Sequence, residues 1–302
     1  MQPLSQWSSL SDQVKLANEL FGSTIGEQKV ANWLAEQRNL VDDVEFAQQF
    51  AAQLRLPGIA VLDYAHRHVR TRHGQLLGGI RFYSRNTARP FVDVLAHNFH
   101  DIDDLTECVV REWAGFNARY LRLRTAPGLF ADRPDVILDR TIHVAPYRDM
   151  APADGRVRLH PFGDPDDAIS LVNARYAELA ATDPTLANNL SVAAPEDLRR
   201  WHFSDQLRAI RAHNTTIGAL AVVPSAIGWI SGEEIHEEVI SEPHAGQGYA
   251  ASAQTAWARC MAVDVDQLLI GTIDRHNHAS RTTAQRTGRP RVLEDIFITW
   301  RA

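Results

Sequence analysis

The chain has 302 residues, of which 45% are hydrophobic and 23% charged, and its formal net charge is −6. These values are typical of one or two ordinary globular domains. The acidic balance excludes a broad attraction for nucleic acid or an anionic membrane surface, so we expect neither as a partner. With no apolar run of 18 residues and no signal-like beginning, the sequence predicts a cytoplasmic location.

The first half of the chain begins with helices and continues with strands. Apolar spacing predicts helices over residues 10–21, 28–34, 44–54 and 103–116. Strands are predicted over residues 59–64, 76–83, 91–96, 120–124 and 136–144. Residues 148–156 are polar and contain Pro and Gly, which predicts a linker between a domain over residues 1–150 and a domain over residues 151–302.

In the second half, helices and strands alternate. Strands are predicted over residues 157–162, 206–212, 217–223, 235–241 and 267–273, with a further strand at the end of the chain. Helices are predicted to begin at Asp164, Pro195, Tyr249 and Asn277. At the first of them, Asp164 is placed to act as N-cap and Pro165 occupies the first helical position.

The stretch between the strand over residues 235–241 and the helix at Tyr249 is the most informative part of the sequence. Pro243 ends the strand because it has no N–H to donate. Gly246 and Gly248 lack a Cβ, so the backbone can turn sharply and approach a ligand closely. The following helix directs its unpaired N–H groups and the positive end of its dipole towards this loop. The pattern therefore predicts a site for a diphosphate.

Two classes of ligand fit such a loop. Gly246, Gly248 and Ala251 match the dinucleotide pattern G-x-G-x-x-G/A, and Asp274 ends the next strand near the place of a ribose-binding acid. According to this first alternative, the protein would be an NAD-binding oxidoreductase. However, only 28 residues follow Asp274, whereas a doubly wound nucleotide domain continues through several further units.

The second class follows from a resemblance to a known superfamily. The order strand, glycine loop, helix, strand, Asn-x-x-Ser and closing helix resembles the acetyl-CoA-binding half of the GNAT acetyltransferases, here over residues 239–288 within a complete domain of about residues 155–302. The resemblance implies an α/β (α+β) fold with a mixed central sheet flanked by helices, and acetyl-CoA as the acyl donor. The residues implied to contact acetyl-CoA are Val239, Ile240, Ser241, Ala245, Gly246, Gln247, Gly248, Tyr249, Ala250, Asn277 and Ser280.

Two positions depart from the pattern of this superfamily. Ala245 stands where Arg or Gln is usual, so backbone N–H groups would have to carry more of the diphosphate binding. Ala284 stands where many members have a Tyr that reprotonates the thiolate. These departures motivate a second alternative, a non-catalytic acyl-CoA-binding protein.

The first half of the chain contains a similar series of elements. The order strand, helix, strand, strand over residues 90–145 parallels the order over residues 235–300. The loop over residues 97–101 has no glycine and could not enclose a diphosphate in the same way. Residues 1–150 are therefore either a degenerate second copy, which would make a tandem protein, or an unrelated accessory α/β domain.

The strand before the glycine loop carries the candidate catalytic residues. Acyl transfer to an amine requires a base, because the ammonium form has no lone pair. With regular alternation, Glu234, His236 and Glu238 share one face of the strand, and crowded carboxylates raise one another's pKa. We expect Glu238 to be the base, then His236 or Glu234, and the N–H of Ile240 or Ser241 to polarise the thioester.

The remaining features predict no further chemistry. His276 and His278 lack a third ligand at a fitting distance, so no metal is expected. Cys108 and Cys260 are predicted to be reduced, buried residues on apolar helix faces. The expected acceptor is a primary amine of a small molecule or peptide. The sequence leaves the oligomeric state open between a monomer and a homodimer.

Overall fold

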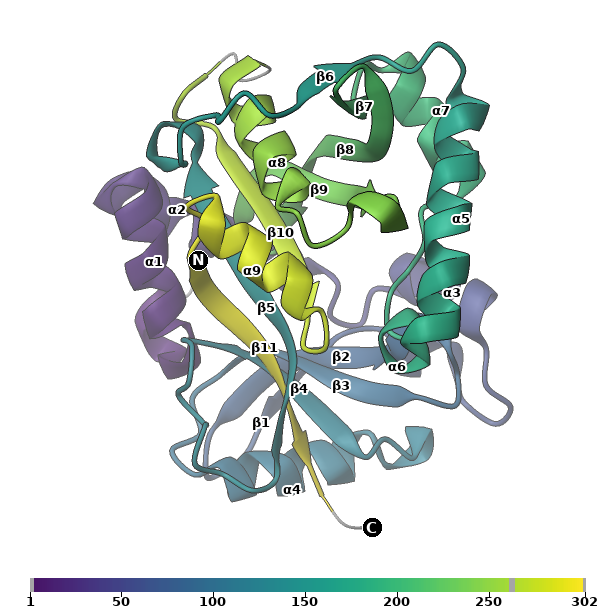
Figure 1. Cartoon of the computed structure of the whole chain (residues 1–302). Helices are drawn as coiled ribbons and strands as arrows, with labels where there is room; N and C mark the ends of the chain where they lie inside the picture. Colours follow the sequence, from purple (N-terminus) through teal and green to yellow (C-terminus); the bar gives the residue numbers. More distant parts are fainter. Residues whose placement is uncertain (1–2, 261–263, 301–302) are drawn as a thin grey trace. The chain divides into compact units, whose positions relative to one another are not determined.

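The chain divides into two compact units in the computed structural model, which describes residues 3–260 and 264–300. Unit 1 comprises Met1–Asp139 together with Leu293–Ala302, and unit 2 comprises Arg140–Val292. Each unit has mixed strands flanked by helices, as the sequence predicts (Figure 1). The boundary differs from the expected one, because the last strand of the chain belongs to unit 1 and not to the second half.

Unit 1 contains five strands in the order β1-β2-β3-β4-β11. They are β1 (Arg67–Arg70), β2 (Gln75–Phe82), β3 (Pro90–His97), β4 (Tyr120–Thr125) and β11 (Arg291–Thr299). All neighbours are antiparallel except β3 and β4, which are parallel. The helices are α1 (Ser11–Phe21), α2 (Ser23–Asn39), α3 (Val44–Leu54) and α4 (Ile102–Glu112).

One face of these strands carries the hydrophobic core of unit 1. Alternate residues of each strand point into it, among them Leu121 and Leu123 of β4 and Ile296 and Ile298 of β11, all almost completely buried. Leu105 of α4 and small residues of α3 cover them. Because Ile296 and Ile298 alternate with the same period as β4, the end of the chain completes this core.

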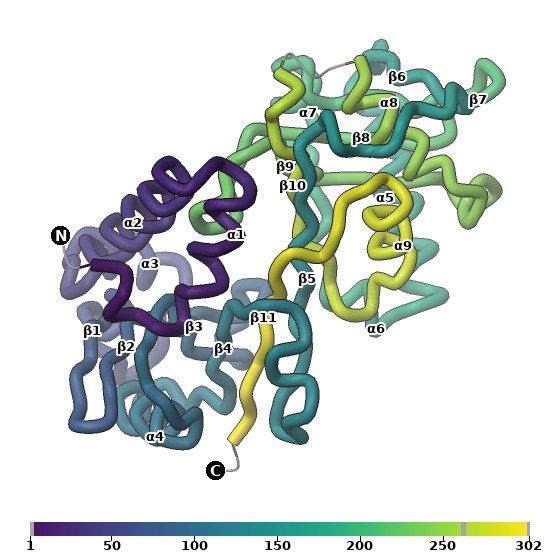
Figure 2. Tube along the Cα trace, turned by 90° about the vertical axis from the view of Figure 1, so that its left-hand side faces the viewer, coloured from purple at the N-terminus to yellow at the C-terminus, as the bar shows by residue number. Residues whose placement is uncertain are grey.

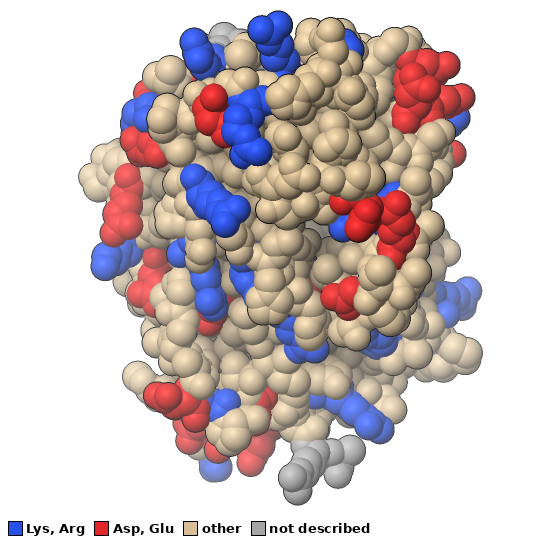
Figure 3. All heavy atoms as spheres, in the orientation of Figure 1, with Lys and Arg blue, Asp and Glu red and all other residues tan. Residues whose placement is uncertain are grey.

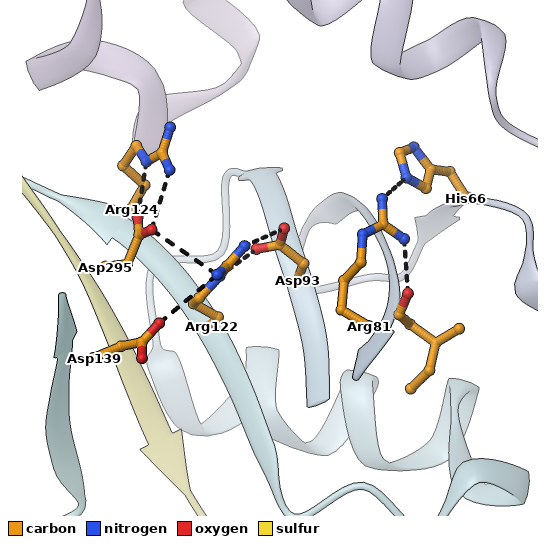
Figure 4. A network of polar contacts seen from close by, with 8 residues as sticks. His66, Arg81, Asp93, Arg122, Arg124, Asp139 and Asp295 are labelled. Atoms are coloured by element: carbon orange, nitrogen blue, oxygen red, sulfur yellow. Dashed lines mark hydrogen bonds and ion pairs between the residues drawn. The ribbon is translucent and has the colours of Figure 1, made fainter. Parts of the chain in front are cut away.

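The opposite face of the same strands carries a network of ion pairs (Figure 4). Arg122 donates two hydrogen bonds to Asp93, at 3.0 and 2.8 Å, and lies 3.7 Å from Asp139. Arg124 donates from Nε and Nη2 to the two carboxylate oxygens of Asp295, at 2.8 and 3.1 Å. Bidentate geometry of this kind is the strong form of the pairing, so the network ties β3, β4, β5 and β11 together by side chains.

Unit 2 contains six strands in the order β5-β10-β9-β8-β7-β6. They are β5 (Val136–Pro146), of which residues 140–146 lie in this unit, β6 (Arg158–His160), β7 (Leu207–Ala212), β8 (Thr215–Ile227), β9 (Ile230–Ile240) and β10 (Leu268–Asp274). Only β9 and β10 are parallel to each other. Figure 2 shows the same chain turned by 90°.

Helices cover both faces of the strands of unit 2. Helices α5 (Pro165–Thr182), α6 (Pro184–Ala187) and α7 (Pro195–Phe203) precede β7, and α5 and α7 pack on one face through Val172, Leu198 and Trp201. Helix α8 (Tyr249–Cys260) packs on the other face through Ala253 and Trp257. Helix α9 (His278–Arg286) follows β10. Asp164 caps α5 by accepting the N–H of Asp166, at 2.9 Å, as predicted.

Two local predictions are wrong. Residues 59–64, expected as a strand, end in the 3-10 turn Val61–Tyr64, where the fully buried Tyr64 accepts the N–H of Leu56 with its hydroxyl. Cys260, the last described residue of α8, is exposed, whereas Cys108 is buried as expected. Within the described ranges, none of the helices is long and apolar enough to cross a membrane.

Candidate functional site

The candidate site lies in unit 2, where β9 leaves β10. The parallel register between the two strands covers two pairs, Glu233 with Leu269 and Glu234 with Ile270. Strand β9 continues to Ile240 along β8, and over that length the described register gives it no partner on β10. The backbone groups on that edge of β9 are therefore available to a ligand.

A β-bulge causes β9 to bend within this segment. Ala221 of β8 pairs with Glu237, but Val222 pairs with Ile235. His236 is therefore an extra residue with no cross-strand partner on β8 in this register. An extra residue of this kind bends the strand that carries it and ends its regular alternation.

Because of the bulge, the candidate catalytic residues of β9 do not lie as the sequence predicted. Glu238 points to the α8 side, where Gln254 Nε2 donates to its Oε2 at 2.7 Å. His236 lies on the opposite face, with its ring centroid 5.5 Å from that of Trp201 on α7 and its Nε2 3.5 Å from Glu234 Oε2. Glu234, His236 and Glu238 therefore do not share one face, because the sequence pattern contains no sign of the extra residue.

The two predicted oxyanion donors, the N–H groups of Ile240 and Ser241, point in opposite directions. Ser241 donates its N–H to Ile217 O of β8, at 2.8 Å, so this group is already used. In an antiparallel pair the direction of the N–H groups alternates. Ile240, which lies opposite Gly218, therefore directs its N–H away from β8 and towards the side on which β10 has separated. Of the two candidates, only Ile240 can donate to a thioester carbonyl.

The glycine loop has the conformation that the sequence predicts. Gly246 and Gly248 have φ values of +72° and +81°, which side chains with a Cβ rarely adopt. A Cβ on Gly246 would meet nothing within 4 Å, so the space beside this residue is open. In α8 the backbone N–H of Ser252 donates to Gly248 O at 3.1 Å, which leaves the N–H groups of the preceding turn directed at the loop.

Two arginines lie beside Gly248. A Cβ on Gly248 would lie 3.5 Å from Arg156 Nη1 and 3.9 Å from Arg286 Nη1. Arg156 is held by Gln247 O, to which its Nη2 donates at 2.9 Å, and by the ring of Tyr249. In the space-filling view, Lys and Arg side chains lie around α8 and α9 among mostly uncharged neighbours (Figure 3). The loop thus combines backbone donors with two positive charges.

Other predicted contact residues have structural roles. Asn277 caps α9 by accepting the N–H of Ser280 with Oδ1, at 3.0 Å. The side chains of Val239 and Ile240 pack in the cores on opposite faces of the strands. Ala284 is fully buried in α9 and offers no proton donor.

Glu238 belongs to a buried polar chain on the α8 side. Gln254 links it to Arg289, whose Nη2 donates to Gln254 Oε1 at 2.8 Å. Burial raises the pKa of Glu238 to about 7 and lowers that of Arg289 to about 10. Within the described chain, Glu238 Oε1 and the Nε and Nη1 atoms of Arg289 are buried and have no hydrogen-bond partner. Buried groups of this kind favour a polar ligand or water beside them.

A second acid, Glu237, is buried on the α5 side. It accepts hydrogen bonds from the hydroxyl of Tyr176, at 3.2 Å, and from the N–H of Ala193, at 3.1 Å. Burial raises its pKa as well. Because both of its oxygens already have donors, Glu237 fastens the loop before α7 to β9 and is a weaker candidate for a base than Glu238.

Sequence reasoning missed Arg156, Arg286, Gln254 and Arg289. Arg156 lies in the expected linker, and the other three lie on helices or at a helix end with no motif around them. The sequence gives no local signal for them beyond the expectation that a cation is missing at Ala245. The described residues contain no group of three side chains that could hold a metal ion.

No family model matches the sequence, and no curated protein matches it. Among solved structures, a GNAT-family acetyltransferase from Colwellia psychrerythraea is 9% identical, with 86% of this chain and 98% of that chain covered and a TM-score of 0.49. A GCN5-related N-acetyltransferase from Kribbella flavida is 14% identical, with 86% and 96% covered and a TM-score of 0.44. A Drosophila protein is 13% identical, with 99% and 98% covered and a TM-score of 0.44. Similarity of this degree does not decide the function, which must be argued from β9 and the glycine loop.

Proposed function

We propose that this protein is an acetyl-CoA-dependent N-acetyltransferase of the GNAT type, which acetylates a primary amine of a small molecule or peptide. One observation carries the proposal. Strand β9 bends at His236, leaves β10, and runs directly into an open glycine loop at the N-terminus of α8, with Arg156 and Arg286 beside Gly248.

The donor would be held at two places. The N–H groups at Gly246–Tyr249 and the guanidinium groups of Arg156 and Arg286 would bind the diphosphate of CoA. The N–H of Ile240 would donate a hydrogen bond to the thioester carbonyl and stabilise the negative charge that develops on its oxygen.

Glu238 would accept the proton of the attacking amine. The amine nitrogen forms a bond to the thioester carbon, the carbon–sulfur bond breaks, and the electron pair leaves on the thiolate of CoA. Ala284 supplies no acid, but a thiol has a pKa of about 8.5, so the thiolate can leave and take a proton from water.

Calorimetric titration with acetyl-CoA tests the site. Wild-type protein is expected to bind, and Gly248→Leu is expected to lose at least about tenfold in affinity, because the side chain would fill the space beside the two arginines. Gly58→Leu is the matched control: Gly58 has φ +78° in unit 1 and open space around its Cβ position, so the backbone strain is similar. Binding of NAD in place of acetyl-CoA would reject the proposal.

An amine-acceptor screen then separates enzyme from binding protein. Wild-type protein should release free thiol with an amine acceptor, and Glu238→Gln should bind acetyl-CoA normally but turn over far more slowly. Binding with no turnover for any amine would favour the non-catalytic alternative.

We also propose that unit 1 is a degenerate copy of the same fold. The series β3, α4, β4, β5 follows the order of β9, α8, β10, β11. Strand β3 has an extra residue, Leu95, because Leu77 pairs with Ala96 and Gly78 with Val94. It is parallel to β4 over two pairs, as β9 is to β10. The acidic start of α4, with Asp101 as its N-cap, disfavours a diphosphate there.

A further inference from the structure

Unit 1 contains a cavity of about 150 Å³ where β3 leaves β4. Its walls come from the ends of the two strands, from residues 129–130 and from the N-terminal segment over residues 8–13. That segment crosses the end of β3 (Figure 2), where Ser9 Oγ accepts the N–H of His97 at 2.8 Å. A volume of about 150 Å³ is large enough for a molecule the size of benzene.

Two polar side chains in this cavity have no partner. His97 and Thr125 are each 8% exposed, and both line the cavity. His97 Nδ1 and Thr125 Oγ1 are buried without a hydrogen-bond partner within the described residues. Burial of such groups without a hydrogen-bond partner destabilises the folded protein. The pair therefore indicates a bound molecule with its own polar group.

The charges around the cavity favour an uncharged molecule. Arg124 lines the wall, but Asp295 already neutralises it through two hydrogen bonds. Burial lowers the pKa of His97 to about 4, so its imidazole is neutral near pH 7. Asp12, at the exposed start of α1, disfavours an anion, and the N-terminal end of that helix disfavours a cation. Neither an anionic nor a cationic ligand would therefore find a free counter-charge inside the cavity.

The rest of the wall is apolar on one side and polar on the other. The apolar side consists of Val94 and Leu95 from β3, Leu123 from β4, and Leu129 and Phe130 from the following loop, whereas the N-terminal segment contributes Ser8, Ser9, Ser11 and Gln13. A wall that combines apolar side chains with polar uncharged groups suits a molecule with one polar end and a short apolar body.

We propose that unit 1 binds a small uncharged molecule, a short-chain amide or alcohol of up to about eight non-hydrogen atoms, through His97 and Thr125. The polar end of the molecule exchanges hydrogen bonds with His97 Nδ1 and Thr125 Oγ1, and its apolar body lies against Leu95 and Leu123. This site is independent of the acyl-CoA loop and of whether unit 2 is an enzyme.

Titration by NMR with butyramide, butyrate and butylammonium tests the site, since these probes differ almost only in charge. In the full-length protein, butyramide is expected to shift the His97 ring nitrogens with a dissociation constant in the millimolar range, typical of ligands this small. Thr125→Val, which keeps the shape but removes the hydroxyl, should weaken binding about tenfold, whereas Thr125→Ser should keep most of it. The melting temperature of each variant checks that unit 1 is folded.

Each contrary outcome rejects the proposal. If the His97 signals respond to butyrate or butylammonium but not to butyramide, the site selects charge and not an uncharged group. If Thr125→Val binds butyramide as well as Thr125→Ser does, the hydroxyl is not part of a site. If none of the three probes moves the His97 signals, the cavity is a packing defect.

Discussion

Glu238 combines burial with an oxygen that has no donor. Its raised pKa, about 7, is close to the value at which a general base accepts protons well under physiological conditions. The neighbouring Glu237 shows the contrast, because its two oxygens are occupied by Tyr176 and Ala193. The two adjacent acids thus have different surroundings, which the sequence alone could not distinguish.

The first prediction concerns the pH dependence of acetyl transfer. Activity should fall as pH decreases through about 7, because protonated Glu238 cannot accept the amine proton. Glu238→Gln should lower kcat by about 10²- to 10⁴-fold and remove this dependence. Rates measured from pH 5 to 9 check this, with Glu234→Gln as the control that keeps the profile. An unchanged profile in Glu238→Gln would assign the base elsewhere.

The same group affects stability in a defined pH window. The folded pKa of Glu238 is raised from 4.5 to about 7, so its contribution is complete below pH 4.5 and decreases as pH rises to about 7. The loss amounts to about 3 kcal/mol, since each unit of pKa corresponds to about 1.4 kcal/mol. Denaturant unfolding of Glu238→Gln should therefore show a smaller loss of stability between pH 4.5 and 7 than wild type.

The second prediction concerns the two arginines. Arg156→Gln and Arg286→Gln should each raise the dissociation constant for acetyl-CoA about tenfold, because each removes a charged donor to the diphosphate. Arg158→Gln, two residues along and also exposed, should leave it unchanged. Titration at two salt concentrations checks the assignment. Loss of salt dependence in the double variant is expected, and equal effects at Arg158 would indicate only general attraction.

At the scale of elements, the bulge in β9 decides which residues face α8. The sequence predicted the later part of β9, the glycine loop and the start of α8, because Pro243, Gly246 and Gly248 each have a direct effect on the backbone. It could not predict the bulge, since His236 is an ordinary residue and the extra position is defined only by the pairing with β8. The prediction that the acids share one face was therefore wrong, because the pairing of β9 with β8, and not the local sequence, determines the direction of these side chains.

The third prediction is that deletion of His236 removes the function but keeps the fold. Without the extra residue, Ile235 and Glu237 alternate regularly, and the residues after them keep their faces. The strand should straighten and no longer turn away from β10. Circular dichroism should remain close to wild type while acetyl-CoA binding is lost. Retained binding in the deletion variant would show that the bend is not needed.

At the scale of the whole molecule, the strand that follows the elements of each unit in the sequence pairs with the strands of the other unit. Residues 140–146 of β5, which follows the elements of unit 1, pair with β10 of unit 2. Strand β11, which follows the elements of unit 2, pairs with β4 of unit 1 from Glu294 to Thr299. Sequence reasoning recognised both strands but placed each in its own half, because strand partners more than 120 residues apart leave no local trace.

The fourth prediction follows from this pairing. Truncation after Pro290 removes Ile296 and Ile298 from the core of unit 1, and removal of a buried Ile side chain typically costs about 2–5 kcal/mol. Hydrogen exchange should show loss of protection in β3 and β4. The chain with Ile296→Val alone is the mild control and should lose about 1 kcal/mol. Unchanged protection in the truncated chain would show that β11 is dispensable.

The pairing of β4 with β11 also sets the order in which the protein can fold during its synthesis. Domains usually fold from the N-terminus as the ribosome releases them. Here the first 139 residues leave the ribosome long before β11, whose Ile296 and Ile298 complete their core. Unit 2 is continuous and can fold as soon as it emerges, so the unit that is begun first completes its core after the other. In the interval, β4 presents an unpaired edge, which makes the nascent chain dependent on protection from aggregation until β11 is made.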